Sequence, residues 1–258
     1  MHLLRLAWYV LISALLAPAS ITAQLSPPQD PHAVALLQRS VRDMGGAAPT
    51  DSVATGNVVL VEGSKTTSGT MRILTRGLDQ SAEHVDTPGG RRSLIYSQGQ
   101  ANAVEGTTLS QFSLELAASS QSPNFPLVLL AGALNNPDAA FQYLGIEAVG
   151  TAQAHHIRFW NTFSSSPKLA HLAAFSVKNI WIDIGSGLPI KLTYDRRAGG
   201  GAEPRIPIEV HYSDYRNVGG VLYPFLVETK YNGTPWATTT ISSVNLNTGL
   251  SEAAFSVQ

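Results

Sequence analysis

Histidines and carboxylates are the side chains that could carry catalysis or hold a metal, and they are thinly spread in this sequence. Of its seven histidines, only His155 and His156 are adjacent. Neighbouring residues on a β-strand point to opposite faces, so this pair cannot jointly ligate one metal ion there. His211 falls on the polar face of its predicted strand. We therefore expect structural or surface roles for these histidines.

The acidic residues on or near predicted strands do not form a catalytic pair. A glycosidase needs two carboxylates that face each other across a substrate cleft. Alternation along the strands places most of the candidates on the solvated face; they are Asp183, Asp195, Glu209, Asp214 and Glu228. The sequence contains no Gly-x-Ser-x-Gly, His-Glu-x-x-His, Walker or Gly-x-Gly-x-x-Gly motif. We predict that the protein is not an enzyme and holds no cofactor and no metal.

The composition of the chain excludes further classes of function and further kinds of site. The 258 residues are 44% hydrophobic and 14% charged, with a net charge of -1 and no cysteine. A chain without a basic surplus has no electrostatic basis for binding nucleic acid. The absence of cysteine excludes disulfides, thiolate zinc sites and a lipidated N-terminal cysteine.

The N-terminus has the features of an export signal. Arg5 precedes an apolar run over residues 6–16, and small residues follow at Ala17, Ala19 and Ala23. This run is shorter than the roughly 20 residues that a membrane-spanning helix needs, although a retained anchor is the alternative. We predict a cleavable signal peptide over residues 1–23, a single domain over residues 32–258, no permanent membrane span, and a periplasmic or secreted location.

The elements that would position any site are mainly β-strands. Over residues 180–246, apolar and polar residues alternate with a period of two, which is typical of antiparallel strands with one buried face. The pair Asn232-Gly233 predicts a tight hairpin turn between two of them. Further strands are predicted between residues 52 and 104, at 141–149 and at 154–163, whereas 164–174 is a loop or a short helix and 198–204 a hairpin loop.

Three segments have helical or non-alternating patterns. His32–Met44 has apolar residues at three- and four-residue spacing. Leu109, Phe112 and Leu116 indicate a short helix, and Phe125–Leu134 is apolar on all sides, which favours burial against a sheet. A single sheet with this many strands must curve to cover its apolar face. We predict a mainly β (α+β) fold, in which the N-terminal helix and two central helices cover the concave face of a curved antiparallel sheet.

Two C-terminal segments resemble one known family. Residues 180–192 read IWIDIGSGLPIKL, which resembles the hairpin pattern W-(I/V)-D-x-x-(T/S)-G-L-P-x-K. Residues 212–224 read YSDYRNVGGVLYP, which resembles Y-x-D-Y-R-x-V-x-G-V-x-x-P, and Asn245, Leu250 and Phe255 resemble a closing pattern. These are patterns of the outer-membrane lipoprotein carriers, which have the LolA/LolB-like fold. The resemblance covers about the last 80 residues.

The resemblance implies an open half-barrel of about eleven antiparallel strands around a hydrophobic cavity. Members of this family hold acyl chains there without chemistry, and each buried methylene contributes about 0.8 kcal/mol. Phe125–Leu134 is then either a movable lid or a fixed core helix. The region between Gly69 and Arg92 lacks the family's aromatic-rich pattern, so the resemblance does not assign the family's ligand-gripping arginine to any of Arg72, Arg76, Arg91 and Arg92.

Aromatic residues are candidates for the cavity lining, with sheet core as the alternative for each. They are Trp160, Trp181, Trp236, Tyr223 and Phe225. The predicted ligand cavity consists of Leu127, Leu130, Ile157, Phe159, Trp181, Ile190, Leu192, Ile208, Val210, Tyr223 and Phe225.

Three functions are compatible with these patterns. The first is a soluble, exported, monomeric protein that binds the acyl chain of a lipid or lipoprotein as a carrier or chaperone. The second is a cell-envelope module that uses the same fold to bind proteins or act as a sensor. The third is an unrecognised hydrolase, against which the missing catalytic motifs argue.

Overall fold

The computed structural model describes residues 27–119, 123–197 and 205–256. The predicted signal peptide and the predicted loop at 198–204 lie outside these residues. In the described part, the helices are α1 (Pro31–Asp43), α2 (Leu114–Ser119) and α3 (Pro126–Asn135), with the 3₁₀ helices η1 (Pro167–Phe175) and η2 (Glu252–Phe255). No helix in these ranges is long and apolar enough to cross a membrane.

The strands fall into a group before α2 and a group after α3. The first group is β1 (Asp51–Glu62), β2 (Lys65–Arg76), β3 (Gln80–Thr87), β4 (Gly90–Ser97), β5 (Gln100–Glu105) and β6 (Thr108–Gln111). The second group is β7 (Ala139–Val149), β8 (Ala152–Asn161), β9 (Lys178–Asp183), β10 (Pro189–Arg197), β11 (Arg205–Val218), β12 (Val221–Tyr231) and β13 (Thr234–Leu246).

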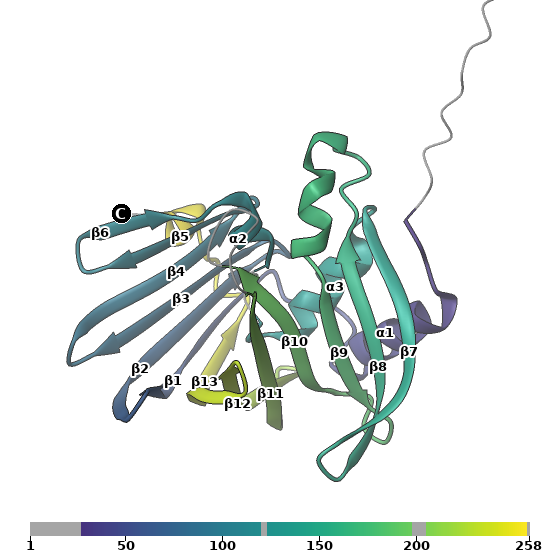
Figure 1. The fold of residues 1–258 in the computed structure, drawn as a ribbon. Helices are drawn as coiled ribbons and strands as arrows, with labels where there is room; N and C mark the ends of the chain where they lie inside the picture. Colours follow the sequence, from purple (N-terminus) through teal and green to yellow (C-terminus); the bar gives the residue numbers. More distant parts are fainter. Residues whose placement is uncertain (1–26, 120–122, 198–204, 257–258) are drawn as a thin grey trace, which may run out of the picture.

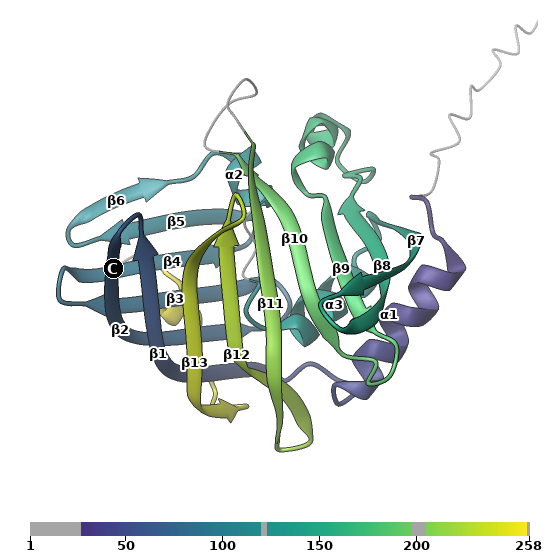
Figure 2. The same ribbon diagram turned by 60° about the horizontal axis from the view of Figure 1, so that its bottom comes forward.

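All thirteen described strands form one antiparallel sheet, in the order β6-β5-β4-β3-β2-β1-β13-β12-β11-β10-β9-β8-β7. The sheet curves strongly, and its edge strands β6 and β7 do not meet (Figures 1 and 2). The prediction of a curved, open antiparallel sheet is therefore confirmed.

The predicted number of about eleven strands was too low. One reason is that Leu109, which was expected to begin a helix, lies in β6 and pairs with Val104 of β5. Helix α2 starts only at Leu114. The spacing of Leu109, Phe112 and Leu116 thus spans a strand end and a helix start, and it is not one helical face.

Helix α1 forms where the sequence predicts it. Asp30 caps its N-terminus by accepting hydrogen bonds from the backbone N–H groups of His32 and Ala33, at 2.9 and 3.4 Å. Its buried stripe includes Ala33 and Leu37, and the chain leaves the helix through Gly45 at a φ of +126°. The helix packs beside α3 (Figure 2).

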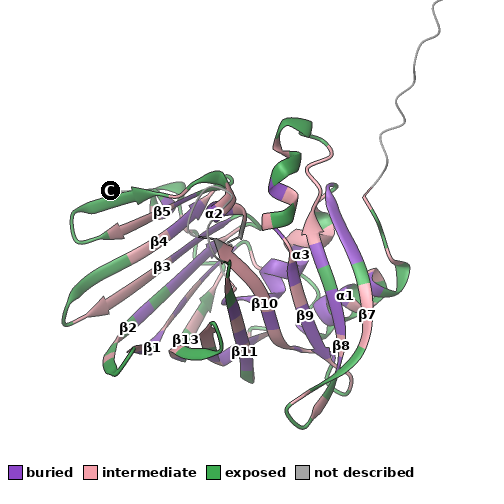
Figure 3. Cartoon of the chain, in the orientation of Figure 1, coloured by how far each residue is buried: buried purple, intermediate pink, exposed green. Residues whose placement is uncertain are grey.

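The main hydrophobic core lies on the concave face of the sheet, where α1 and α3 meet strands from both halves. A small second cluster consists of Leu74, Ala82, Ile95 and Phe255. Ile73 belongs to the main core and its neighbour Leu74 to the second cluster, so the two clusters lie on opposite faces of β2. Figure 3 shows the buried residues running through the middle of the strands.

The residues that carry the family resemblance build turns and anchors. Asp183 Oδ1 accepts hydrogen bonds from the N–H and the hydroxyl of Ser186, both at 2.7 Å, which closes the β9–β10 turn. The Tyr215 hydroxyl donates to the Pro189 carbonyl at 2.7 Å. Asn232 and Gly233 have φ values of +49° and +76°, which fits the predicted tight hairpin turn.

The end of the chain returns to the start of β1. The Asp51 carboxylate accepts backbone hydrogen bonds from Thr248, Gly249 and Leu250, at 2.6, 2.8 and 3.2 Å. It also accepts one from the Thr248 hydroxyl at 2.7 Å. Because Asp51 is buried, these bonds fix the segment that leads to η2 against the sheet.

Candidate functional site

An apolar cavity of about 650 Å³ lies between α2, α3, η1 and the ends of several strands. This volume is within the range of small-molecule sites. Its apolar lining includes Leu114 and Ala117 of α2, Phe125, Val128 and Leu129 at α3, Phe159 and Trp160 of β8, and Leu169 and Leu172 of η1. Both α2 and η1 lie at the same end of the sheet (Figure 1).

Helix α3 lies between this cavity and the main core. Leu127 and Leu130 are fully buried in the core and do not line the cavity, whereas Val128 and Leu129 belong to the core and also line the cavity, as Gly132 does. Residues three and four apart share one face of a helix, so α3 presents one apolar face to the core and another to the cavity. Because both faces of α3 have apolar surroundings, the segment is apolar on all sides, which fits the prediction of a buried helix.

The rim of the cavity is also apolar. Leu78, in the turn between β2 and β3, is 41% exposed, and Leu114 of α2 is 50% exposed, yet both line the cavity. A Cβ atom at Gly132 would lie 3.3 Å from the Leu78 carbonyl oxygen, so glycine lets this turn approach α3 closely. Exposed leucines beside a hollow are a feature of binding sites for apolar ligands.

The structure brings most of the predicted cavity residues into the main core. They are Leu127, Leu130, Ile157, Leu192, Ile208, Val210, Tyr223 and Phe225. Phe159 also belongs to this core, and it is the member of the predicted set that lines the cavity. A ligand contact at the other positions stays a prediction.

Two of the predicted cavity residues lie apart from this group. Trp181 follows Ile180, which faces the core, so its side chain lies on the outer face of the sheet. There it stacks on His156, with ring centroids 4.1 Å apart. Ile190 is half-buried at a register shift between β9 and β10. The structure does not bring either side chain to the cavity.

Lys178, at the start of β9, was not among the predicted site residues. Its side chain lines the cavity, and the residue is only 2% exposed. Its Nζ atom lies 6.0 Å from the centre of the Tyr194 ring, and no hydrogen bond or ion pair to it is present among the described residues. Burial lowers the pKa of Lys178 from 10.5 to about 8.

Two other polar side chains that line the cavity, those of Gln80 and Ser176, are hydrogen-bonded to neighbouring residues. Gln80 accepts a hydrogen bond from Arg76 at 2.7 Å and donates one to Ser97 at 2.9 Å. Ser176 donates to the Asn161 carbonyl at 3.2 Å and accepts from the Asn161 N–H at 2.9 Å. These groups form part of the wall and carry no charge, so among the residues that the structure describes they provide no counter-ion for the buried Lys178.

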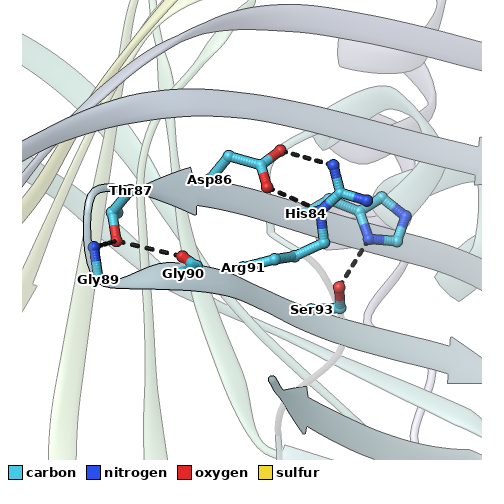
Figure 4. Close-up of polar contacts among 7 residues, drawn as sticks. All are labelled: His84, Asp86, Thr87, Gly89, Gly90, Arg91 and Ser93. Carbon is cyan, nitrogen blue, oxygen red and sulfur yellow. Dashed lines mark hydrogen bonds and ion pairs between the residues drawn. The ribbon is translucent and has the colours of Figure 1, made fainter. Parts of the chain in front are cut away.

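None of the four arginines considered in the sequence lines the cavity. Arg91 donates two hydrogen bonds to the carboxylate of Asp86, at 2.7 and 2.8 Å, across the β3–β4 hairpin (Figure 4). In the same hairpin, the Thr87 hydroxyl donates to the Gly90 carbonyl at 3.2 Å. Arg92 pairs with Glu105 of β5 at 3.0 Å. These arginines stabilise hairpins.

The outer face of the sheet carries a polar network. His156 Nδ1 lies 2.8 Å from a Glu147 oxygen, and Trp181 Nε1 donates to Glu147 at 2.9 Å. His155 instead contacts the Tyr143 hydroxyl at 3.1 Å. The two adjacent histidines therefore have separate surroundings, as strand alternation predicts. Within the described residues, no group of three His, Cys, Asp or Glu side chains could hold a metal.

The network continues to Glu209 on β11. Its carboxylate lies 2.9 Å from Lys191 Nζ, 2.7 Å from His211 Nε2 and 3.0 Å from Lys230 Nζ. Burial opposes its ionisation, but the hydrogen bonds from these three neighbours prevail and lower its pKa to about 2. These contacts join β10, β11 and β12 on the face opposite the core, so we interpret them as structural.

The curved open sheet with helices on its concave face has the arrangement of the LolA-like fold. A domain named for outer membrane lipoprotein sorting, from Vibrio parahaemolyticus, superposes with a TM-score of 0.60 at 12% identity. The match covers 87% of this chain and 96% of that domain. A LolA superfamily protein from Nitrosomonas europaea gives 0.59 at 11% identity, covering 87% and 97% of the two chains.

A third solved structure, a DUF1329 family protein from Desulfovibrio piger, gives a TM-score of 0.56 at 13% identity, with 87% and 97% of the two chains covered. No family model matches the sequence, and no curated protein matches it significantly. The chain has a LolA-like fold, and the resemblance seen in its C-terminal motifs is confirmed at the level of the fold.

Proposed function

We propose that the protein is an exported lipid-binding protein that holds an acyl chain of a lipid or lipoprotein in the cavity between α2, α3 and η1. It acts without catalysis, as a carrier or chaperone. The observation that carries this proposal is the apolar cavity of about 650 Å³ with exposed leucines at its rim. A dry apolar wall favours a hydrocarbon chain over water.

The free energy that such a cavity contributes to binding depends on the length of the acyl chain it holds. Ten methylenes moved out of water contribute about 8 kcal/mol, at about 0.8 kcal/mol each. That corresponds to a dissociation constant of about 1 μM before the entropic cost of association is subtracted. A chain long enough to fill the cavity is therefore needed, and a short alkyl group binds weakly.

The fold supports the same proposal by analogy. The Vibrio domain is named for lipoprotein sorting, and the Nitrosomonas protein for the LolA superfamily. Analogy between folds is a weaker argument than the site itself, because one fold hosts many functions. With the predicted signal peptide over residues 1–23, we place the protein in the periplasm or outside the cell.

A variant that fills the cavity tests the proposal. Ala133 of α3 lines the cavity, whereas Ala35 of α1 is exposed, so Ala133→Trp and Ala35→Trp form a matched pair. Each protein is purified from an exporting host and analysed by native mass spectrometry with lipid extraction. We expect the wild type and Ala35→Trp to carry an acyl lipid, and Ala133→Trp to be free of it.

A wild-type protein that always has the mass of the bare chain would contradict the proposal. The fold would stand, and a protein-binding module of the cell envelope would be the better hypothesis. An Ala133→Trp protein that folds and retains its lipid would show that the lipid lies elsewhere.

A further inference from the structure

Lys178 is a buried cation in a cavity whose surface is mainly apolar. It lines the same cavity as Phe159 and Leu172, and 98% of its surface is covered, since only 2% is exposed. A buried ammonium group costs free energy unless an anion or a set of acceptors compensates it. Its Nζ atom lies over the Tyr194 ring, whose centre is 6.0 Å away, and it forms no hydrogen bond or ion pair with any other described residue.

No carboxylate of the described chain neutralises this lysine. Asp79 is the carboxylate that lines the cavity, but it is exposed in the turn between β2 and β3 and forms no ion pair with Lys178. The lowered pKa of Lys178 arises from burial, with no contribution from a neighbouring acid. The free protein therefore holds a cation whose counter-ion must come from outside the described chain.

We propose that Lys178 binds the anionic head group of the ligand, so that the cavity selects a fatty acid carboxylate over neutral lipids of the same chain length. This inference rests on the proposed function, because the acyl chain supplies the rest of the affinity. One carboxylate neutralises one ammonium group. A phosphate monoester, with a charge of about -1.5 to -2, would leave part of its charge uncompensated in an apolar site.

Affinity for a matched pair of ligands tests this inference. The delipidated full-length protein is titrated with palmitic acid and with methyl palmitate by calorimetry at neutral pH. A charge-assisted hydrogen bond makes the acid bind about ten- to a hundredfold more tightly than the ester to the wild type. Lys178→Met should lose this preference, and Lys178→Arg should keep it.

Two controls separate the explanations. Lys191→Met removes a lysine on the outer face of the sheet, so the preference for the acid should persist. Acetate tests for a site that binds bare anions, and we expect it to give no binding heat in the same concentration range.

The outcomes distinguish this inference from the proposed function. Equal affinity of the wild type for acid and ester, or a preference retained by Lys178→Met, would overturn the role of Lys178 alone. Acetate binding as tight as that of palmitic acid would instead show that the acyl chain adds no affinity, which contradicts the proposed function. If neither acid nor ester binds the wild type, the proposed function itself fails.

Discussion

Replacing Lys178 with Met should stabilise the ligand-free protein by about 3 kcal/mol at pH 7. The pKa of Lys178 in the folded protein is about 8, below its ordinary value of 10.5, and each pKa unit corresponds to about 1.4 kcal/mol. Methionine has a similar length and fills the same space without a charge. The wild-type protein holds an uncompensated charge in an apolar wall, and the variant does not.

The pH dependence of this difference follows from the direction of the shift. Below pH 8 the lysine is protonated in both the folded and the unfolded state, so the penalty is fully present. Between pH 8 and 10.5 the unfolded chain binds more protons than the folded one, so the stability of the wild type rises with pH relative to the variant. Above pH 10.5 the penalty is absent.

Urea unfolding of both delipidated proteins, followed by far-ultraviolet circular dichroism at several pH values between 7 and 10.5, measures this difference. Buried tyrosines with raised pKa values, such as Tyr212 and Tyr215, titrate in both proteins, so their effect cancels in the comparison. A stability difference that does not change with pH, or a wild type more stable than Lys178→Met at pH 7, would refute this reasoning.

Three further predictions concern the network, the C-terminal anchor and α3. Glu209→Gln should cost about 2 kcal/mol at pH 7: the shift of its pKa from 4.5 to about 2 corresponds to about 3 kcal/mol, which solvent screening at this partly exposed carboxylate reduces. This stability is present above pH 4.5 and lost as the pH falls to 2, so the urea midpoint of the variant should be less sensitive to acid; equal midpoints at pH 7 would contradict this. Asp51→Asn should lower the free energy of unfolding by about 2 kcal/mol, because it weakens four hydrogen bonds, and calorimetry should show a lower Tm. As a control, Asp79→Asn in an exposed turn should leave the Tm unchanged. Leu130→Ala should cost about 2–5 kcal/mol in urea unfolding, because Leu130 is fully buried in the core and away from the cavity. Val128→Ala should cost clearly less, because it removes fewer carbon atoms and Val128 also borders an existing cavity; equal losses would contradict this packing of α3.

The fold was largely predictable because its signals are local. Alternation over residues 180–246 and the Asn232-Gly233 turn determine strands and hairpins through near neighbours in the chain. The stripe of Leu37 and Val41 likewise identifies the core face of α1. Strand β6 was missed because all four of its residues are exposed and its pairing with β5 gives no apolar pattern.

The cavity was harder to locate, because its walls come from distant parts of the chain. A segment such as Phe125–Leu134, apolar on every side, does not reveal which face meets the core. Its second stripe, Phe125, Val128 and Leu129, could have been assigned only with the positions of α2 and η1 known. In the sequence, Lys178 is an ordinary polar residue at the end of a predicted strand. Its burial depends on tertiary packing, which the local sequence does not indicate.

The family resemblance predicted the fold better than it predicted the residues that line the cavity. Tyr212, in the second motif, donates a hydrogen bond from its hydroxyl to the Pro123 carbonyl at 2.7 Å, just before α3. Tyr215 similarly anchors Pro189. These residues position the elements around the cavity but do not line it, so the resemblance alone could not identify the lining.

Quenching of tryptophan fluorescence by a bromine-labelled fatty acid tests the central claim most directly. Trp160 lines the cavity, whereas Trp181 lies on the outer face and Trp236 stacks on Tyr231. Two variants are compared: one retains only Trp160 and the other only Trp181, and Phe replaces each of the remaining tryptophans, Trp8 included. We predict strong, saturable quenching of Trp160 and none of Trp181. Equal quenching of both, or quenching of neither, would contradict an acyl chain in this cavity.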